Sequence, residues 1–463
     1  MGHIDTSYRD RTWTPQPKAE AFVRGLLDAA LAGNPAAAAF ADGLLENCAV
    51  RLRDLLDHLV VDAATIAEAE AHGWAQGAHD AWHQPLGLFP PLVKGDRPAV
   101  WFRVENAEDF VRATGTAAPV EGQEHGPVRR VLAFPATGAG YAFGAIARQG
   151  YVGFDMPVFE DGLIRAARLH LQNFRARRRQ FDTVDLGLAH TERLVDAAVA
   201  DLGQHWACAI WLKAEREYWM SRCPAGRLQK ALQDAVGIGW SNIDHHTYDG
   251  SRRYFRHTIR ILETLGYELR EMLYAGHMAG WGSQVLEQPV LGSTIFADVD
   301  LAPEELDIDF AHVVLPELEK HRRAGILSIL HGESILEGGL NHVAGLYDQK
   351  ALRALLGRRG LKMMQPFSNF PFLYQELTEG DWAPVEPSRV DDLEAGGHLT
   401  AKEAEDIRLN GYIAAHLENI ERNDGYKGFN KPGIDGVLRA LDPRAAVRDT
   451  AQGKDAAAKD AAE

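Results

Sequence analysis

The chain has 463 residues, a formal net charge of −16, 46% hydrophobic residues and 25% charged residues. This composition is typical of a globular protein and excludes a disordered chain, a collagen-like chain and a small disulfide scaffold. An acidic chain repels nucleic-acid phosphates and anionic lipids, so we expect neither nucleic acid nor membrane as a partner. Three widely spaced cysteines, no secretory signal and no membrane-spanning run favour a cytoplasmic protein.

The first half of the chain changes character near residue 95. Apolar residues recur at helical spacing in the N-terminal part, so residues 1–95 are expected to be a helical region. Short runs of β-branched and aromatic residues at 100–104 and 127–134 then predict strands. These strands place a first α/β module at 96–160.

The second half is expected to begin with a helical insertion at 161–237, whose basic stretch at 175–179 we interpret as a solvated helix face. A second α/β module with C-terminal helices is expected at 238–444. Its predicted elements are strands at 241–248, 268–275, 284–290, 293–299 and 326–335 and helices at 252–265 and 402–422. The order strand, helix and three strands is that of a βαβββ unit. The tail at 445–463 has no aromatic residues and is predicted to be disordered.

Histidines and carboxylates beside the expected strands are the candidate site residues. His125 and Arg129 are four residues apart, so on a strand they would face one side, with a possible ligand beside a fixed cation. The adjacent His245 and His246 would face opposite sides of their strand. Two histidines and a carboxylate such as Glu333 are typical ligands of non-haem Fe(II). With 19 histidines in the chain, spacing alone leaves a structural role open for each.

Three segments resemble the 2-oxoadipate dioxygenase/decarboxylase family, also called hydroxyglutarate synthases, whose fold is similar to the vicinal-oxygen-chelate superfamily. The family's H-G-x-x-R segment matches residues 125–129, and its I-N-H-x-T segment matches 243–247, with Asp244 in place of asparagine. Its glutamate segment, with L-Y-D about a dozen residues later, matches Glu333 and residues 346–348. The Gln-Arg pair that follows the glutamate in the family is absent here.

The resemblance implies an α+β fold with a vicinal-oxygen-chelate-like β-sheet core of βαβββ units. It also implies Fe(II) bound by His125, His245 and Glu333. Arg129 would then bind a substrate carboxylate through its guanidinium fork. The alternative for Arg129 is an ion pair with Glu124 or Asp244.

Asp244 and His246 are expected to orient the metal ligands. Glu337 is a substitute carboxylate ligand, and His331 could be a fourth ligand or a proton donor.

The implied partners are a 2-oxo acid and O2, with oxidative decarboxylation and hydroxylation as in the conversion of 2-oxoadipate to 2-hydroxyglutarate. Two alternatives stay open: a divalent-metal isomerase or lyase, and a non-enzymatic binding protein. The oligomeric state is not predicted.

Overall fold

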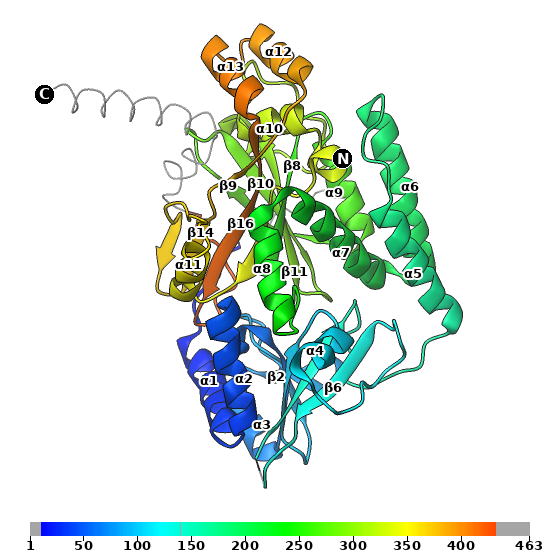
Figure 1. The fold of residues 1–463 in the computed structure, drawn as a ribbon, viewed down its shortest axis with the longest axis vertical. Coiled ribbons are helices and arrows are strands. Elements are labelled where there is room, and N and C mark those ends of the chain that lie inside the picture. The colour runs from blue at the N-terminus through cyan, green and yellow to red at the C-terminus, as the bar shows by residue number, and fades with distance from the viewer. Residues whose placement is uncertain (1–10, 139, 432–463) are drawn as a thin grey trace, which may run out of the picture.

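Two curled β-sheets, one above the other in Figure 1, form the framework of the protein. The computed structural model describes residues 11–138 and 140–431. The N-terminal sheet has seven strands and the C-terminal sheet has nine. No helix in the described part of the chain is long and apolar enough to cross a membrane.

The first sheet has the strand order β2-β3-β4-β1-β5-β7-β6. Its strands are β1 (Leu56–Val61), β2 (Ala75–Gln76), β3 (Ala81–His83), β4 (Leu92–Lys94), β5 (Ala99–Arg103), β6 (Val128–Phe134) and β7 (Ala142–Arg148). Helix α3 (Ala63–Ala71) follows β1, and β1 pairs in parallel with β4, which makes a βαβββ unit. Helix α4 (Ala107–Thr114) follows β5, which pairs in parallel with β7, in a shorter βαββ unit. The two units join through the antiparallel pair β1 and β5.

The second sheet repeats this plan. Its strands are β8 (Ile243–Gly250), β9 (Glu268–Tyr274), β10 (Trp281–Gln288), β11 (Ser293–Asp300), β12 (His342–Leu346), β13 (Ser368–Phe370), β14 (Leu373–Leu377), β15 (Asp381–Ala383) and β16 (Tyr412–Arg422). Their order is β13-β14-β16-β12-β8-β11-β10-β9, with β15 beside β16. Helix α9 (Phe255–Thr264) follows β8, which is parallel to β11, and α11 (Gln349–Gly357) follows β12, which is parallel to β16. The antiparallel pair β8 and β12 joins the two units. The predicted α+β class with βαβββ units is confirmed.

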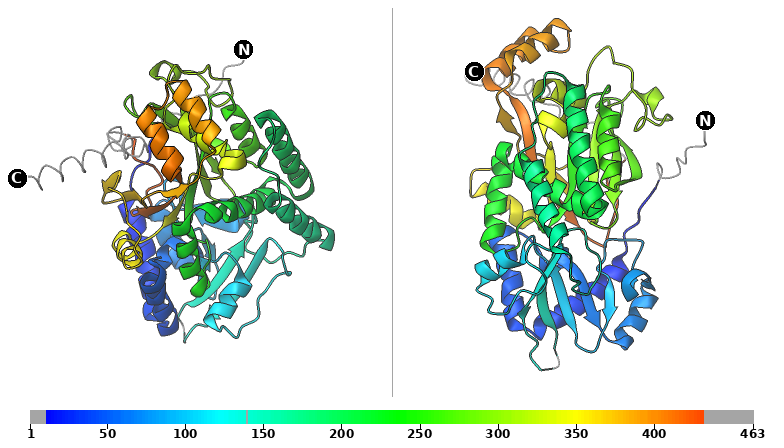
Figure 2. Two further views of the ribbon diagram at one scale, coloured as in Figure 1. Left: turned by 45° about the horizontal axis from the view of Figure 1, so that its top comes forward. Right: turned by 90° about the vertical axis from the view of Figure 1, so that its right-hand side faces the viewer.

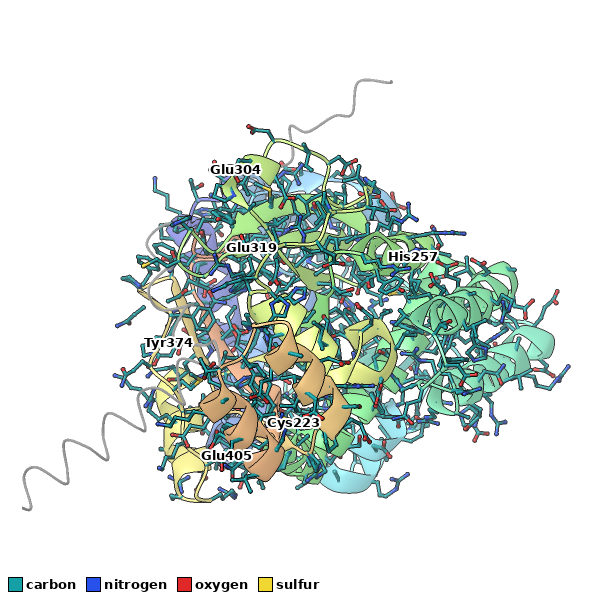
Figure 3. All side chains as sticks on the ribbon, turned by 90° about the horizontal axis from the view of Figure 1, so that it is seen from above. Cys223, His257, Glu304, Glu319, Tyr374 and Glu405 are labelled. Atoms are coloured by element: carbon teal, nitrogen blue, oxygen red, sulfur yellow. The ribbon has the colours of Figure 1, made fainter. Side chains whose placement is uncertain are left out.

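The remaining helices cover the sheets and connect them. They are α1 (Pro17–Ala32), α2 (Pro35–Cys48), α5 (Asp161–Arg175), α6 (Val184–Leu202), α7 (Gln204–Arg222), α8 (Pro224–Ala235), α10 (Arg323–His331), α12 (Pro387–Ala395) and α13 (Ala401–Asn410). Short helical turns are η1 (Leu52–Leu55), η2 (Ala78–Asp80), η3 (Pro303–Glu305) and η4 (Ser334–Gly338). Helix α8 packs on α2 and α4 of the first half and on β16 of the second, so it ties the halves together (Figure 2). Seen from above, α12 and α13 lie over one end of the molecule, with Tyr374 of β14 and His257 of α9 on opposite sides (Figure 3).

Three predicted segments differ from the structure. The expected helical region 1–95 contains α1, α2 and α3, but it also contains β1–β4, which share a sheet with β5–β7. Residues 326–335, predicted as a strand, lie largely in α10. Residues 402–422, predicted as one helix, form α13 and then β16. Helix α10 and strand β16 are buried on nearly all sides, so apolar periodicity does not distinguish a helix from a strand there. Strands β2, β3 and β4 are only two or three residues long, too short for a clear alternation. The expected insertion at 161–237 consists of α5–α8, and the predicted tail at 445–463 lies outside the described residues.

Candidate metal centre

Two histidines and a glutamate meet on one face of the second sheet. His245 of β8 lies opposite Ala344 of β12, and Ala344 lies opposite Glu418 of β16. His342 precedes Ala344 by two residues on β12 and therefore faces the same side. One possible ligand atom from each of the three residues lies within 4.8 Å of the others, and within 11–138 and 140–431 no other group of three meets this condition. Three adjacent strands thus bring together residues that are far apart in the sequence.

The imidazole rings are held so that both Nε2 atoms point at the same carboxylate oxygen. His245 Nε2 and His342 Nε2 each lie 3.0 Å from Glu418 Oε2. On its other side, His245 Nδ1 donates to Asp244 at 2.8 Å, and His342 Nδ1 lies 3.1 Å from the Asn341 side-chain oxygen. Ligand histidines usually have such a partner on the nitrogen that does not bind the metal. The donor set and its supports therefore fit a divalent cation.

Charge attraction inside this group is strong because His245 and Glu418 are buried and His342 is only partly exposed. Burial lowers the pKa of His245, but Glu418 and Asp244 outweigh it and raise this pKa to about 9. Burial raises the pKa of Glu418, but His245 and His342 outweigh it and hold this pKa well below its usual range. The pKa of His342 is lowered, because burial exceeds the attraction of Glu418. A carboxylate that stays ionised in an enclosed site attracts cations.

The three residues line a cavity of about 70 Å³ whose other walls are mainly apolar. Trp281, Phe296 and Phe429 are among these walls and keep bulk water away from the group. One cation faces the same cavity: Arg323, which donates to Asp298 and to Asn341 at 3.1 Å each. We call His245, His342 and Glu418 the metal-ligand group. An anion that enters the cavity would therefore lie near a guanidinium group as well as near the metal-ligand group.

The first sheet repeats part of this arrangement. His58 of β1 pairs through Nδ1 with Asp57 at 2.6 Å, and Arg148 at the end of β7 binds Asp57 with two nitrogens at 2.8 and 2.9 Å. In the second sheet the corresponding residues are His245, Asp244 and, at the end of β16, Arg422, which binds Asp244 at 2.6 and 3.1 Å. An Asp-His pair on the first strand and an arginine from the last strand thus occur in both halves.

The first sheet has no metal-ligand group at the corresponding place. His58 lies opposite Trp101 of β5, and Trp101 lies opposite Gly144 of β7, where the second sheet has Ala344 and Glu418. The Trp101 ring stacks on His58 and occupies the space beside Gly144, where a Cβ atom would lie 2.4 Å from the ring. A bulky indole therefore fills the position that is open in the second sheet.

The structure does not bring the ligands predicted from the sequence together. His125 lies in the turn before β6 with φ of 62°, and its half-exposed side chain is 3.5 Å from a Glu124 carboxylate oxygen. Strand β6 begins only at Val128, so the alternation that would align His125 with Arg129 does not hold. Arg129 forms an ion pair with Glu108 of α4, a different partner from the two considered above.

Glu333 is buried between α10 and η4, where it accepts the Ser251 backbone N–H at 3.0 Å. Burial raises its pKa to about 7. Because Glu333 and His125 lie outside the group, His245 is the one member of the predicted ligand set within it. Glu337 forms an ion pair with Arg389, and His331 Nε2 lies 3.0 Å from the Ile413 carbonyl oxygen.

The two predicted orienting residues have different positions. Asp244 contacts His245 directly, as described above. His246 points to the opposite face of β8, where its Nε2 lies 3.3 Å from Arg216 Nη1 of α7. The alternation expected for the two adjacent histidines is thus present in the structure.

Sequence reasoning missed His342 and Glu418. His342 stands four residues before the Leu-Tyr-Asp segment at 346–348, in a short β-like run that could have indicated a strand. Glu418 lies in the segment that was expected to be helical.

Comparisons with known proteins give fold likenesses only. No protein-family model matches the chain, and no curated protein sequence matches it. Among solved structures, a variant of 4-hydroxymandelate synthase from Streptomyces coelicolor is 13% identical, with 85% of this chain and 99% of that chain covered and a TM-score of 0.28. Methylmalonyl-CoA epimerase from Mycobacterium tuberculosis is 13% identical, with 40% and 89% covered and a TM-score of 0.22. The fold class rests on the strand order and pairing described above.

Proposed function

We propose that the protein is a metal-dependent enzyme in which His245, His342 and Glu418 bind Fe(II) and the substrate is a 2-oxo acid. The observation that carries this proposal is the convergence of two imidazole nitrogens on one buried carboxylate. Two histidines and one carboxylate leave coordination positions for substrate and dioxygen, as in non-haem Fe(II) oxygenases. When bound, Fe(II) supplies the redox chemistry for decarboxylation of the 2-oxo acid and hydroxylation of the remaining carbon chain.

The residues around the group have defined tasks in this proposal. Arg323 replaces Arg129 as the cation that binds the substrate carboxylate, because Arg323 lines the cavity while Arg129 lies on β6 of the first sheet. Asp244 holds the His245 ring in position. The aromatic walls exclude water from the reacting carbon atoms. A cavity of about 70 Å³ favours a short 2-oxo acid over a long one.

Oxygen uptake tests this function. Protein loaded anaerobically with Fe(II) is mixed with oxygenated buffer and pyruvate, 2-oxoglutarate or 2-oxoadipate, and both O2 and CO2 are measured. We expect uptake coupled to CO2 release with at least one acid, and none with the metal-ligand variant Glu418→Ala. Absence of uptake with every 2-oxo acid, while Fe(II) stays bound, would count against an oxygenase.

A second candidate is a divalent-metal isomerase or lyase that removes a proton next to a carbonyl group. The observation that favours it is Asp298, a buried carboxyl group in the cavity wall. Burial, together with nearby Asp249, outweighs Arg323 and raises the pKa of Asp298 above its usual range, which suits a general base. Anaerobic exchange of substrate hydrogen for deuterium would support this function, and its loss in Asp298→Asn would assign the base. Metal binding without oxygen uptake or exchange would favour a binding protein.

A further inference from the structure

A second, larger cavity of about 590 Å³ lies between the two sheets. Its walls include the start of β1 and the ends of β5 and β7 from the first sheet, helix α7, and the start of β8 from the second sheet. His246 lines this cavity, whereas its neighbour His245 lines the cavity of the metal-ligand group. Because adjacent residues of a strand face opposite sides, β8 separates the two cavities. Small-molecule sites commonly have volumes of 300–1,000 Å³.

Basic side chains outnumber acidic ones along the walls of this cavity. Each acidic residue in its walls already has a basic partner within 4.0 Å. These pairs are Glu20 with Arg53, Asp54 with Arg51, Asp57 with Arg148, Glu105 with Lys213 and Lys230, Asp244 with Arg422, and Glu287 with Arg270 and Lys427. The carboxylates of the cavity are therefore occupied.

Three arginines in the walls have no such partner: Arg24, which is exposed, and Arg103 and Arg216, which are half-buried. Neither Arg103 at the end of β5 nor Arg216 of α7 forms an ion pair with any described residue, and the Nε atom of each is buried without a hydrogen-bond acceptor. The one polar contact of the Arg216 head group is Nη1 with His246 Nε2 at 3.3 Å. A half-buried guanidinium group with no carboxylate within 4.0 Å is unfavourable, because the protein interior replaces its hydration poorly. An anion in the cavity would remove this cost.

We propose that the cavity between the sheets binds a small organic anion, with its carboxylate or phosphate group held by Arg103 and Arg216. A guanidinium fork matches the oxygen geometry of either group. The apolar part of the ligand would contact side chains such as Phe154, Leu212 and Leu291, which line the same cavity. Arg103 belongs to β5 of the first sheet, and Arg216 belongs to α7, which packs against β16 of the second sheet, so the anion would connect the two halves. The positive charge of the two arginines also allows an anion to bind despite the net charge of −16 of the chain.

Calorimetric titration of the full chain tests this site with phenyl phosphate, phenylacetate and the neutral benzyl alcohol as probes. We expect one or both anions to bind and benzyl alcohol not to bind. Arg103→Met and Arg216→Met should each weaken anion binding at least tenfold. The control Arg112→Met removes an exposed arginine of α4 that pairs with Asp109, and it should bind as the unmodified protein does. Binding of neither anion, or equal binding by all variants, would overturn the proposal.

Thermal unfolding gives a second readout. Without anion, Arg103→Met should melt at or above the temperature of the unmodified protein, because a half-buried charge without an ion pair has been removed. With 10 mM phenyl phosphate, the unmodified protein should gain stability and the variant should gain less. If the methionine variants do not fold, Arg103→Lys and Arg216→Lys keep the charge but lose the fork, and unchanged affinity in both would overturn the proposal.

The anion site is independent of the proposed oxygenase function. His342→Ala should therefore keep its affinity for phenyl phosphate even though it loses metal. Loss of anion binding in this variant would contradict a separate site. Failure of the oxygen-uptake experiment would leave the anion-binding result unaffected.

Discussion

His245 and Glu418 are separated by 173 residues, yet His245 Nε2 lies 3.0 Å from Glu418 Oε2. They meet because β8 and β16 flank the same strand, β12, and both residues lie opposite Ala344. The small side chain of Ala344 leaves the space between them open. The first sheet has Trp101 at the corresponding place, and the Asp-His pair there is covered by the indole ring.

The importance of Ala344 can be tested by adding bulk. Ala344→Leu should abolish metal binding, because the longer side chain would occupy the space between His245 and Glu418. Overpacking of this buried position should also reduce the free energy of unfolding by about 1–3 kcal/mol. Co(II) titration followed by visible absorbance measures binding, and urea unfolding measures stability. Ala344→Ser is the control that should retain metal; unchanged Co(II) affinity in Ala344→Leu would contradict the geometry.

Asp244 is expected to act through His245. Asp244→Asn keeps the shape of the side chain but removes the charge that holds His245 Nδ1–H, so metal affinity should fall roughly 10–100-fold. The same substitution at Asp57, which holds His58 in the first sheet, is the matched control and should leave metal affinity unchanged. Competition with a chelator measures both affinities, and an equal loss in the two variants would indicate a general effect on folding.

The residues proposed from the sequence give a further test. His125→Ala, Glu333→Gln and Arg129→Ala should each retain the metal content of the unmodified protein, because all three side chains lie outside the group around Glu418. Metal analysis after gel filtration checks this. A metal-free but folded His125→Ala or Glu333→Gln protein would restore the ligand set implied by the family resemblance.

Acid stability should depend on Glu105. Burial opposes its ionisation, but Lys213, Lys230, Arg216 and the Trp240 backbone N–H together outweigh burial and lower its pKa to about 2 from a usual 4.5. A pKa that is lower in the folded chain stabilises the fold above pH 4.5, and this stabilisation is lost as the pH falls toward 2. The shift corresponds to about 3 kcal/mol. In urea unfolding between pH 2 and pH 7, Glu105→Gln should lose stability at pH 7 and show a flatter acid dependence, while exposed Asp109→Asn should change little. An unaltered acid dependence in Glu105→Gln would contradict the assignment.

The sequence predicted the fold class and one residue of the candidate metal centre, His245, and both predictions depend on local patterns. The strand-helix-strand pattern of residues 241–299 is regular enough to indicate a βαβββ unit, and this unit places His245 on its first strand. Alternation along that strand also separated His245 from His246. Such patterns depend only on residues that are close together in the sequence, so they can be recognised from a single sequence.

The rest of the site depends on contacts between distant segments. Strand β16 lies between β14 and β12 and is buried on both faces, so residues 412–422 show no alternation and their composition predicts a helix. Because a helix was expected there, the position of Glu418 beside β12 could not be predicted from the sequence. His125 was placed on a strand that begins three residues later, at Val128, and its backbone has a left-handed conformation that strands do not contain.

Metal content tests the central claim most directly. The unmodified protein, His245→Ala, His342→Ala, Glu418→Ala and the control His416→Ala are loaded anaerobically with Fe(II), passed through a desalting column and analysed for iron. His416 lines the same cavity, two residues before Glu418 on β16, but lies outside the ligand group. We predict one iron per chain in the unmodified protein and in His416→Ala, and little or none in the other three. Full iron content in His342→Ala and Glu418→Ala would contradict the proposed metal centre.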